Sequence, residues 1–280
     1  MIGMADASLD RAALETLLAF YVEAGVDCLV DEVPHDRFAE TRRPPVPPAT
    51  AALERPAAPA SAGTAPPRRA LPGAAAAPPE VIAESAREQA RNAQTLDELE
   101  ALLNAFEGCA LKFSAKNLAF ADGTPGSRVM FVGEAPGADE DRVGKPFVGR
   151  AGQLLDRMLA AIGLDRGQVY IANIVPWRPP GNRTPTPQEF AICRPFIERQ
   201  IELSDPDILV CLGGASAQAL LETRDGILKM RGRWFPYRTG KRELRAFPTL
   251  HPAYLLRQPL QKRLAWRDFR SIRRALDGKA

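Results

Sequence analysis

Residues 133–156 read GEAPGADEDRVGKPFVGRAGQLLD, a segment whose residue types could act on a closely bound ligand. It contains five glycines, which allow backbone to approach a ligand, and five acidic residues that could handle protons or water. A single aromatic residue, Phe147, stands among them, and the apolar run RVMFV comes directly before the segment. A polar loop of this composition after a buried strand is typical of a binding site.

Three more apolar runs each lead into a polar segment. The four predicted strands are 128–133, 168–173, 207–213 and 244–250. Between them, residues 151–164, 186–203 and 214–222 have helical spacing of apolar residues. This alternation predicts a three-layer α/β/α sandwich with a central, mostly parallel four-stranded sheet. Ligands bind beyond the carboxyl ends of such strands, so the four polar segments form one candidate site.

Two common phosphate-binding loops are excluded by the residues present. A Walker loop needs Gly-Lys followed by Ser or Thr, but Gly144-Lys145 is followed by Pro146. No Gly-x-Gly-x-x-Gly follows a predicted strand, so a dinucleotide-binding fold has no support either.

The rest of the chain divides by composition into an arm, a linker and a folded domain. Residues 1–43 form an arm in which 8–31 have the spacing of an amphipathic helix, which either binds a partner protein or caps its own domain. Residues 44–80 form a Pro/Ala-rich linker that we expect to be disordered, since residues 44–79 alone contain 11 Pro and 13 Ala. The folded domain is predicted to span residues 90–280.

Charge follows the same division. Residues 1–90 contain 8 basic and 13 acidic residues, a net charge of −5, which leaves 29 basic and 21 acidic residues, net +8, in the rest. A basic domain fits a polyanionic partner such as nucleic acid. Neither a secretory signal nor a membrane-spanning run is recognisable, so we expect a cytoplasmic protein without membrane contact.

Three polar segments together resemble the family 4 uracil-DNA glycosylases. The matching patterns are GEAPG-x-x-E-D-x-x-G-x-P-F-V-G-x-A-G, N-x-x-x-x-R-P-P-x-N-R-x-P and H-P-x-Y-L-L, in this order over roughly residues 105–270. The resemblance implies base-excision repair of bacterial DNA: the enzyme flips deoxyuridine out of the helix, hydrolyses its N-glycosidic bond and releases free uracil. We expect a monomer that associates with the nucleoid.

The resemblance also implies roles for individual residues. Asn173 would read the uracil edge, because its amide can accept from N3–H and donate to O4, whereas cytosine reverses that pattern. Phe147 would stack on the ring, while Gly133 and Ala135 would line it with backbone N–H groups. His251, in its neutral form, would donate to uracil O2 and stabilise the negative charge of the leaving base. The alternatives are ordinary structural roles: backbone bonding for Asn173, core packing for Phe147 and capping of a strand end for His251.

The carboxylate that activates water stays open at this point. Family 1 enzymes place an Asp at the third position of the first motif. This chain has Ala135 there, and family 4 enzymes in general also lack that Asp. Glu134 is the first candidate, followed by Glu140 and Asp141, for which loop capping is the alternative.

Contacts to DNA are expected from two segments. Arg178, Asn182 and Arg183 lie on a Pro-stiffened loop suited to phosphates. The other segment contributes Tyr254, Leu255, Leu256 and Arg257. There, one leucine would wedge into the gap left by the flipped nucleotide, or the leucines would instead pack inward.

The cysteines depart from the family pattern. Family 4 enzymes typically hold a [4Fe–4S] cluster with four Cys ligands, but here Phe106 and Trp177 occupy two ligand positions, and only Cys109 and Cys193 remain. We therefore predict a domain without the cluster or any other metal, in which the two aromatic rings fill its volume. A Cys109–Cys193 disulfide is the alternative, disfavoured by a reducing compartment.

Two other functions remain compatible with these patterns. One is a damage-binding or crosslinking protein of the same superfamily, in which a His on an inserted loop traps the sugar; no His lies between Asn173 and His251. The other is a non-enzymatic interaction protein that uses the acidic arm.

Overall fold

The computed structural model describes residue 15 and residues 79–278. The chain divides into two units, Met1–Arg68 and Arg69–Ala280, and the fold below is that of the second. Apart from residue 15, the predicted helix at 8–31, the arm and nearly all of the linker therefore lie outside the described residues, as do Cys28 and His35.

The centre of the domain is a six-stranded sheet in the order β1-β3-β2-β4-β6-β5. The four inner strands run parallel and confirm the predicted ones: β2 (Val129–Gly133), β3 (Tyr170–Asn173), β4 (Ile208–Leu212) and β6 (Glu243–Thr249). Two antiparallel edge strands, β1 (Asp122–Gly123) and β5 (Phe235–Arg238), were not predicted. The sheet therefore has six strands rather than four.

Helices cover both faces of the sheet, which confirms the three-layer prediction. The α-helices are α3 (Pro79–Asn92), α4 (Leu96–Ala105), α5 (Leu111–Ser114), α6 (Ala138–Val143), α7 (Arg150–Ala160), α8 (Pro187–Ser204), α9 (Gly214–Leu221), α10 (Ile227–Met230), α11 (Pro252–Arg257) and α12 (Lys262–Leu276). Short 3₁₀ turns lie at η1 (Arg166–Gln168), η2 (Pro180–Asn182) and η3 (Pro259–Gln261). No helix in the described part of the chain is long and apolar enough to cross a membrane.

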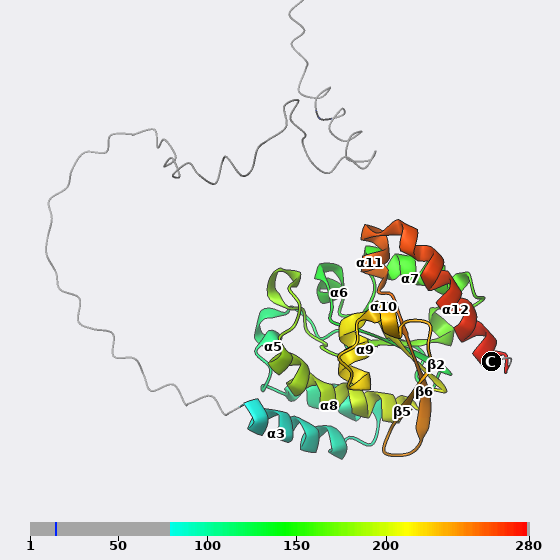
Figure 1. The fold of residues 1–280 in the computed structure, drawn as a ribbon. Helices are drawn as coiled ribbons and strands as arrows, with labels where there is room; N and C mark the ends of the chain where they lie inside the picture. Colours follow the sequence, from blue (N-terminus) through cyan, green and yellow to red (C-terminus); the bar gives the residue numbers. More distant parts are fainter. Residues whose placement is uncertain (1–14, 16–78, 279–280) are drawn as a thin grey trace, which may run out of the picture. The chain divides into compact units, whose positions relative to one another are not determined.

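The two layers of helices pack on alternate residues of the same strands. Met130 and Val132 of β2 face a core shared with α3, α4, α8 and α9, whereas Val129 and Phe131 face a core shared with α7 and α12. Figure 1 shows α3 beside α8 on one side of the sheet, and α7 and α12 on the other. Because both faces are covered, the central strands β2 and β4 are buried throughout, whereas β6 alternates between exposed and buried residues at its start.

The folded domain begins earlier than residue 90. Helix α3 starts at Pro79, and its residues Ala86 and Ala90 are buried in the core that includes Phe196 of α8. The sequence between 80 and 92 is rich in charged residues, and its small apolar face consists mainly of alanines. The sequence pattern therefore did not indicate that this helix belongs to the folded domain.

Candidate active site at the carboxyl edge of the sheet

A cleft of about 700 Å³ opens where the four parallel strands end. Each strand contributes a loop to its lining: Glu134–Gly137 follow β2, Asn173 ends β3, Gly213 and Gly214 follow β4, and His251 follows β6. Parallel strands end at the same edge, so segments far apart in the sequence meet there. Of the predicted site residues, the cleft brings together Glu134, Ala135, Glu140, Phe147, Asn173, Asn182, Arg183, His251, Tyr254 and Arg257.

Phe147 lines this cleft and is otherwise buried. Its ring centroid lies 5.5 Å from that of His251, with the two planes tilted by 34°. The ring also lies over Gly133, where a β-carbon would come within 2.6 Å of Phe147 Cζ and 2.4 Å of Asn173 Oδ1. Gly133 is therefore required so that the ring and the amide can meet at the end of β2.

Asn173 occupies the last position of β3, opposite Gly133 in the parallel register. Its side chain is buried and its Oδ1 has no hydrogen-bond partner among the described residues. A buried acceptor without a partner costs about 1–3 kcal/mol, so such atoms are rare in native proteins. This oxygen lies in the wall of the cleft, where a ligand donor can satisfy it.

His251 caps the N-terminus of α11. Its Nδ1 accepts a hydrogen bond of 3.1 Å from the Ala253 backbone N–H, so a neutral ring carries its proton on Nε2. Burial and the nearby positive charge of Arg257 lower the pKa of His251 to about 4. The imidazole is thus neutral at pH 7 and available as an Nε2–H donor.

Glu134 is the half-buried carboxylate of the cleft. Burial raises its pKa above the ordinary value. Within the described residues its carboxylate forms no hydrogen bond or ion pair, so its oxygens are free to contact a ligand or water.

Glu140 also lines the cleft, but its hydrogen bonds all go to backbone. Oε1 accepts from the N–H groups of Val148 and Gly149 at 3.0 and 2.8 Å, and Oε2 accepts from Gly137 N–H at 3.1 Å. These contacts are those of the loop-capping alternative, and they join the two ends of the glycine-rich segment.

Asp141 of α6 is not among the residues that line the cleft. Its Oδ1 accepts from the backbone N–H groups of Lys116 and Asn117 at 2.7 and 3.3 Å, and Oδ2 lies 3.8 Å from Arg178 Nη1. Asp141 therefore ties the loop before β1 to the Arg-Pro-Pro segment.

The two predicted DNA-binding segments border the cleft in different ways. Arg178 Nε donates to Asn182 Oδ1 at 2.7 Å, and Arg183 is paired with Glu189 through two hydrogen bonds of 2.8 and 2.7 Å. Arg257 is exposed and has no side-chain partner among the described residues. The positive charge of Arg257 is therefore more available to a ligand than the charges of Arg178 and Arg183.

The two leucines after His251 have opposite environments. Leu255 is 1% exposed and packs with Leu250 and Ala265, so the prediction that it contacts DNA is wrong. Leu256 is 36% exposed and remains available as a wedge. On a helix, adjacent residues point about 100° apart, which separates the two side chains.

The sequence analysis did not identify Leu228, which lines the cleft, or Arg166, which contacts the Phe147 backbone from outside it. Leu228 of α10 is 64% exposed and lines the cleft, but GILKM carries no signal that distinguishes it from a core segment. Arg166 donates to the backbone carbonyl of Phe147 from 19 residues away, a contact that no local pattern reveals.

The four positions that match the cluster ligands of the family hold two thiols and two aromatic rings. Cys109 Sγ and Cys193 Sγ lie 3.9 Å apart and both residues are fully buried. Phe106 packs edge-on against Phe196 with ring centroids 5.0 Å apart, and Trp177 is 2% exposed. No group of three or more His, Cys, Asp or Glu side chains within the described residues could hold a metal ion. These residues do not fit a cluster that needs four ligands.

Comparison with known proteins gives consistent matches. The family model of the uracil DNA glycosylase superfamily matches residues 120–270. The chain is 44% identical to the type-4 uracil-DNA glycosylase of Thermotoga maritima over 150 residues, 53% of this chain and 77% of that protein. Identity to the type-4 enzyme of Sulfurisphaera tokodaii is 41% over 170 residues, 59% of this chain and 77% of the relative.

The type-4 enzyme of Archaeoglobus fulgidus is 37% identical over 183 residues, which are 64% of this chain and 92% of that protein. The matched region includes the loops that build the cleft and excludes the N-terminal arm. The chain therefore belongs to the uracil-DNA glycosylase superfamily and, within it, to the type-4 uracil-DNA glycosylases.

Proposed function

We propose that the protein excises uracil from DNA and leaves an abasic site. The observation that carries this proposal is Asn173, whose buried Oδ1 lacks a partner in the wall of a cleft that also contains Phe147. A uracil ring stacked on Phe147 would donate its N3–H to that oxygen. Cytosine has a ring acceptor at N3, so it would leave the oxygen unsatisfied and would be rejected.

The reaction breaks the bond between C1′ of the sugar and N1 of the base, and water adds to C1′. Positive charge develops on the sugar and negative charge on the departing uracil. His251 would donate Nε2–H to uracil O2, where that negative charge accumulates, and needs no proton transfer to do so. Glu134, whose carboxylate is free within the described residues, would orient and deprotonate the attacking water.

Glu140 and Asp141 have a supporting role in this proposal. Their hydrogen bonds to backbone fix the loop that carries Phe147 and the connection to Arg178, so neither needs to touch the reacting atoms. On the DNA side, Arg257 would contact the phosphate backbone and Leu256 would fill the gap left by the flipped nucleotide. The protein would act on DNA as a monomer.

A glycosylase assay tests the activity directly. Purified protein is incubated with oligonucleotides that contain U:G, U:A or single-stranded uracil, and the products are separated after alkaline cleavage. We expect release of free uracil with turnover. A stable protein–DNA adduct on a denaturing gel would instead indicate a crosslinking protein, and intact DNA would indicate a non-enzymatic binder.

The role of Asn173 is tested by Asn173→Ala. We expect kcat/KM on uracil DNA to fall at least 100-fold, because one base-reading contact is lost relative to the free enzyme and substrate. Asn104→Ala is the matched control, since Asn104 is exposed on α4, far from the cleft residues in sequence. A wild-type rate for Asn173→Ala would remove this residue from base recognition.

We also propose that the domain folds without an iron–sulfur cluster. Two thiols cannot supply four ligands, and Phe106 and Trp177 fill the space as apolar side chains. Iron analysis of anaerobically purified protein tests this. We expect no stoichiometric iron and no visible absorbance, whereas brown protein with about four irons per chain would contradict the proposal.

A further inference from the structure

Phe147 has a backbone conformation that is unusual for an aromatic residue. Its φ is +55°, in the left-handed region that disfavours side chains with a β-carbon. Among the described residues three other non-glycines share a positive φ. Asp205 and Glu222 are helix C-caps, where this conformation is common, and Asn182 is of a type that tolerates it. Phe147 has neither explanation, so surrounding contacts must impose its conformation.

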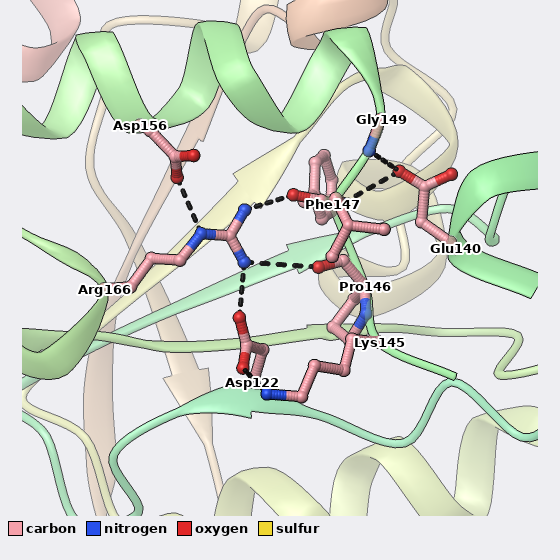
Figure 2. Close-up of polar contacts among 9 residues, drawn as sticks. Asp122, Glu140, Lys145, Pro146, Phe147, Gly149, Asp156 and Arg166 are labelled. Carbon is pink, nitrogen blue, oxygen red and sulfur yellow. Dashed lines mark hydrogen bonds and ion pairs between the residues drawn. The ribbon is translucent and has the colours of Figure 1, made fainter. Parts of the chain in front are cut away.

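Arg166 contacts the backbone on the carbonyl side of Phe147 (Figure 2). Its Nη2 donates to the carbonyl oxygen of Phe147, and its Nη1 donates to the carbonyl of Pro146 at 3.4 Å. The planar guanidinium thus binds two successive carbonyls, which fixes the direction of the peptide rather than a single atom. Arg166 itself lies in η1, directly before β3.

Two carboxylates in turn fix Arg166. Its Nε donates to Asp156 Oδ1 of α7 at 2.7 Å, and its Nη1 donates to Asp122 Oδ2 of β1 at 2.5 Å. Lys145 Nζ binds the other oxygen of Asp122 at 3.0 Å. Although burial alone would raise the pKa of Asp122, hydrogen bonds from Lys145 and Arg166 lower it, so the carboxylate stays charged.

The two N–H groups that follow Phe147 are bound separately. Glu140 Oε1 accepts from the next two N–H groups, those of Val148 and Gly149. Helix α7 passes close to the same carbonyl, since a β-carbon at Gly152 would lie 1.7 Å from Phe147 O. The guanidinium of Arg166 therefore binds two carbonyl oxygens of this loop, and the carboxylate of Glu140 binds two of its N–H groups.

We propose that Arg166 is a positioning residue for base excision, which holds the backbone of Phe147 so that its ring presents a face to the flipped uracil. This inference rests on the proposed function. Arg166 does not line the cleft, so it acts through Phe147 and not by contact with the base. If the guanidinium is removed, the two carbonyls lose their donor, and Phe147 can relax to a negative φ that turns the ring away.

Arg166→Gln tests the proposal through two quantities that depend on stacking: inhibition by free uracil and the single-turnover rate at saturating enzyme. We expect the inhibition constant for uracil to rise and the single-turnover rate to fall, each at least 10-fold. Affinity for uracil-free duplex should stay within about 2-fold, because the DNA-facing rim is unchanged. Arg166→Lys should recover little, since an ammonium cannot bind both carbonyls and both carboxylates in one plane.

Arg199→Gln is the matched control. Arg199 is also part-buried, binds the Ala93 carbonyl through Nε and Nη2 at 3.0 and 2.7 Å, and pairs with Glu202 at 2.5 Å, but it lies on α8 away from the cleft. We expect it to lower the melting temperature without changing either kinetic quantity. If Arg166→Gln behaves in the same way, Arg166 is only a structural residue and the inference is wrong.

Asp156→Asn provides a second variant if Arg166→Gln does not fold. It keeps the guanidinium but removes one of the two carboxylates that orient it, and Asp156 is 46% exposed, so folding should tolerate the change. We expect a smaller change in the same direction for both quantities; wild-type values for both would count against the inference. Wild-type protein that releases no uracil would instead refute the proposed function.

Discussion

The chemistry of His251 is set by its immediate neighbours. The Ala253 N–H occupies Nδ1, and burial together with Arg257 lowers the pKa of His251 to about 4. The same imidazole on an exposed loop would be partly protonated near pH 6.5 and free to adopt either tautomer. Position at the N-terminus of α11 therefore selects one protonation state and one tautomer.

Substitution of this donor should affect turnover more than binding. We expect His251→Ala to lower the single-turnover rate by about 10²–10³, the usual effect of removing one donor to a developing negative charge. Affinity for uracil DNA should change little. The other histidine, His35, lies outside the family match, so His35→Ala is the control and should retain the wild-type rate. Full turnover by His251→Ala would exclude it from the mechanism.

Acid inactivation should report on Glu134. A general base must be ionised, and burial raises the pKa of Glu134 above its ordinary value, so the rate should fall as pH decreases through that raised pKa. His251 becomes charged only near pH 4, and should limit the rate only at lower pH. In Glu134→Gln we expect a slower reaction whose pH profile is flat down to about pH 5. An unchanged acid limb in that variant would assign the titration to another group.

The connection between β3 and α8 carries the DNA-facing rim and also Trp177, which occupies one of the ligand positions of the family's cluster. Arg178 and Arg183 lie on its exposed side, while Trp177 is buried in the core that also contains Phe106 and Cys193. An aromatic side chain buried at this point packs beneath the rim, which is consistent with the proposal that the domain folds without a cluster.

This role predicts a large loss of stability for Trp177→Ala. Removal of a fully buried Trp typically costs about 3–5 kcal/mol, through lost burial and a residual cavity. Trp266→Ala is the matched control, since Trp266 is 46% exposed and should change the free energy of unfolding by less than about 1 kcal/mol. Urea unfolding measures both. Equal losses for the two variants would mean that Trp177 is not a packing anchor.

At the scale of the whole molecule, helix α3 belongs to the catalytic domain although it precedes the family match. Its alanines pack against α8, and the carbonyl of Ala93, just after its end, accepts two hydrogen bonds from Arg199. The matched region begins at residue 120, so the family comparison by itself does not reveal this helix.

Two truncations should therefore behave differently. Deletion of residues 1–78 should leave the glycosylase rate and the melting temperature close to those of the full chain, because it removes nothing from the cleft or from the described core. Deletion of residues 1–94 also removes α3 and exposes the face of α8, and should lower the melting temperature by several degrees. An inactive 79–280 protein would show that the arm takes part in the reaction.

The sequence by itself determined the four inner strands, the three helices between them and the edge at which the polar loops meet. These features depend on local periodicity and on which residue follows each strand, and the structure contains them within a few residues. The roles of Asn173, Phe147 and His251 came from the resemblance to the family 4 enzymes, and Glu134 was the first candidate carboxylate in the first matched motif. Asn173, Glu134 and His251 stand at or just after the end of a strand, whereas Phe147 follows α6.

Only the tertiary structure decided which side chains face the cleft and which support it. Leu255 and Leu256 are adjacent and chemically identical, yet packing against Leu250 buries only the first. Asp141 turns towards the loop before β1, and Arg166 reaches Phe147 from η1. These outcomes depend on contacts between segments distant in sequence, and no local pattern records the direction in which a side chain points once those segments are packed together.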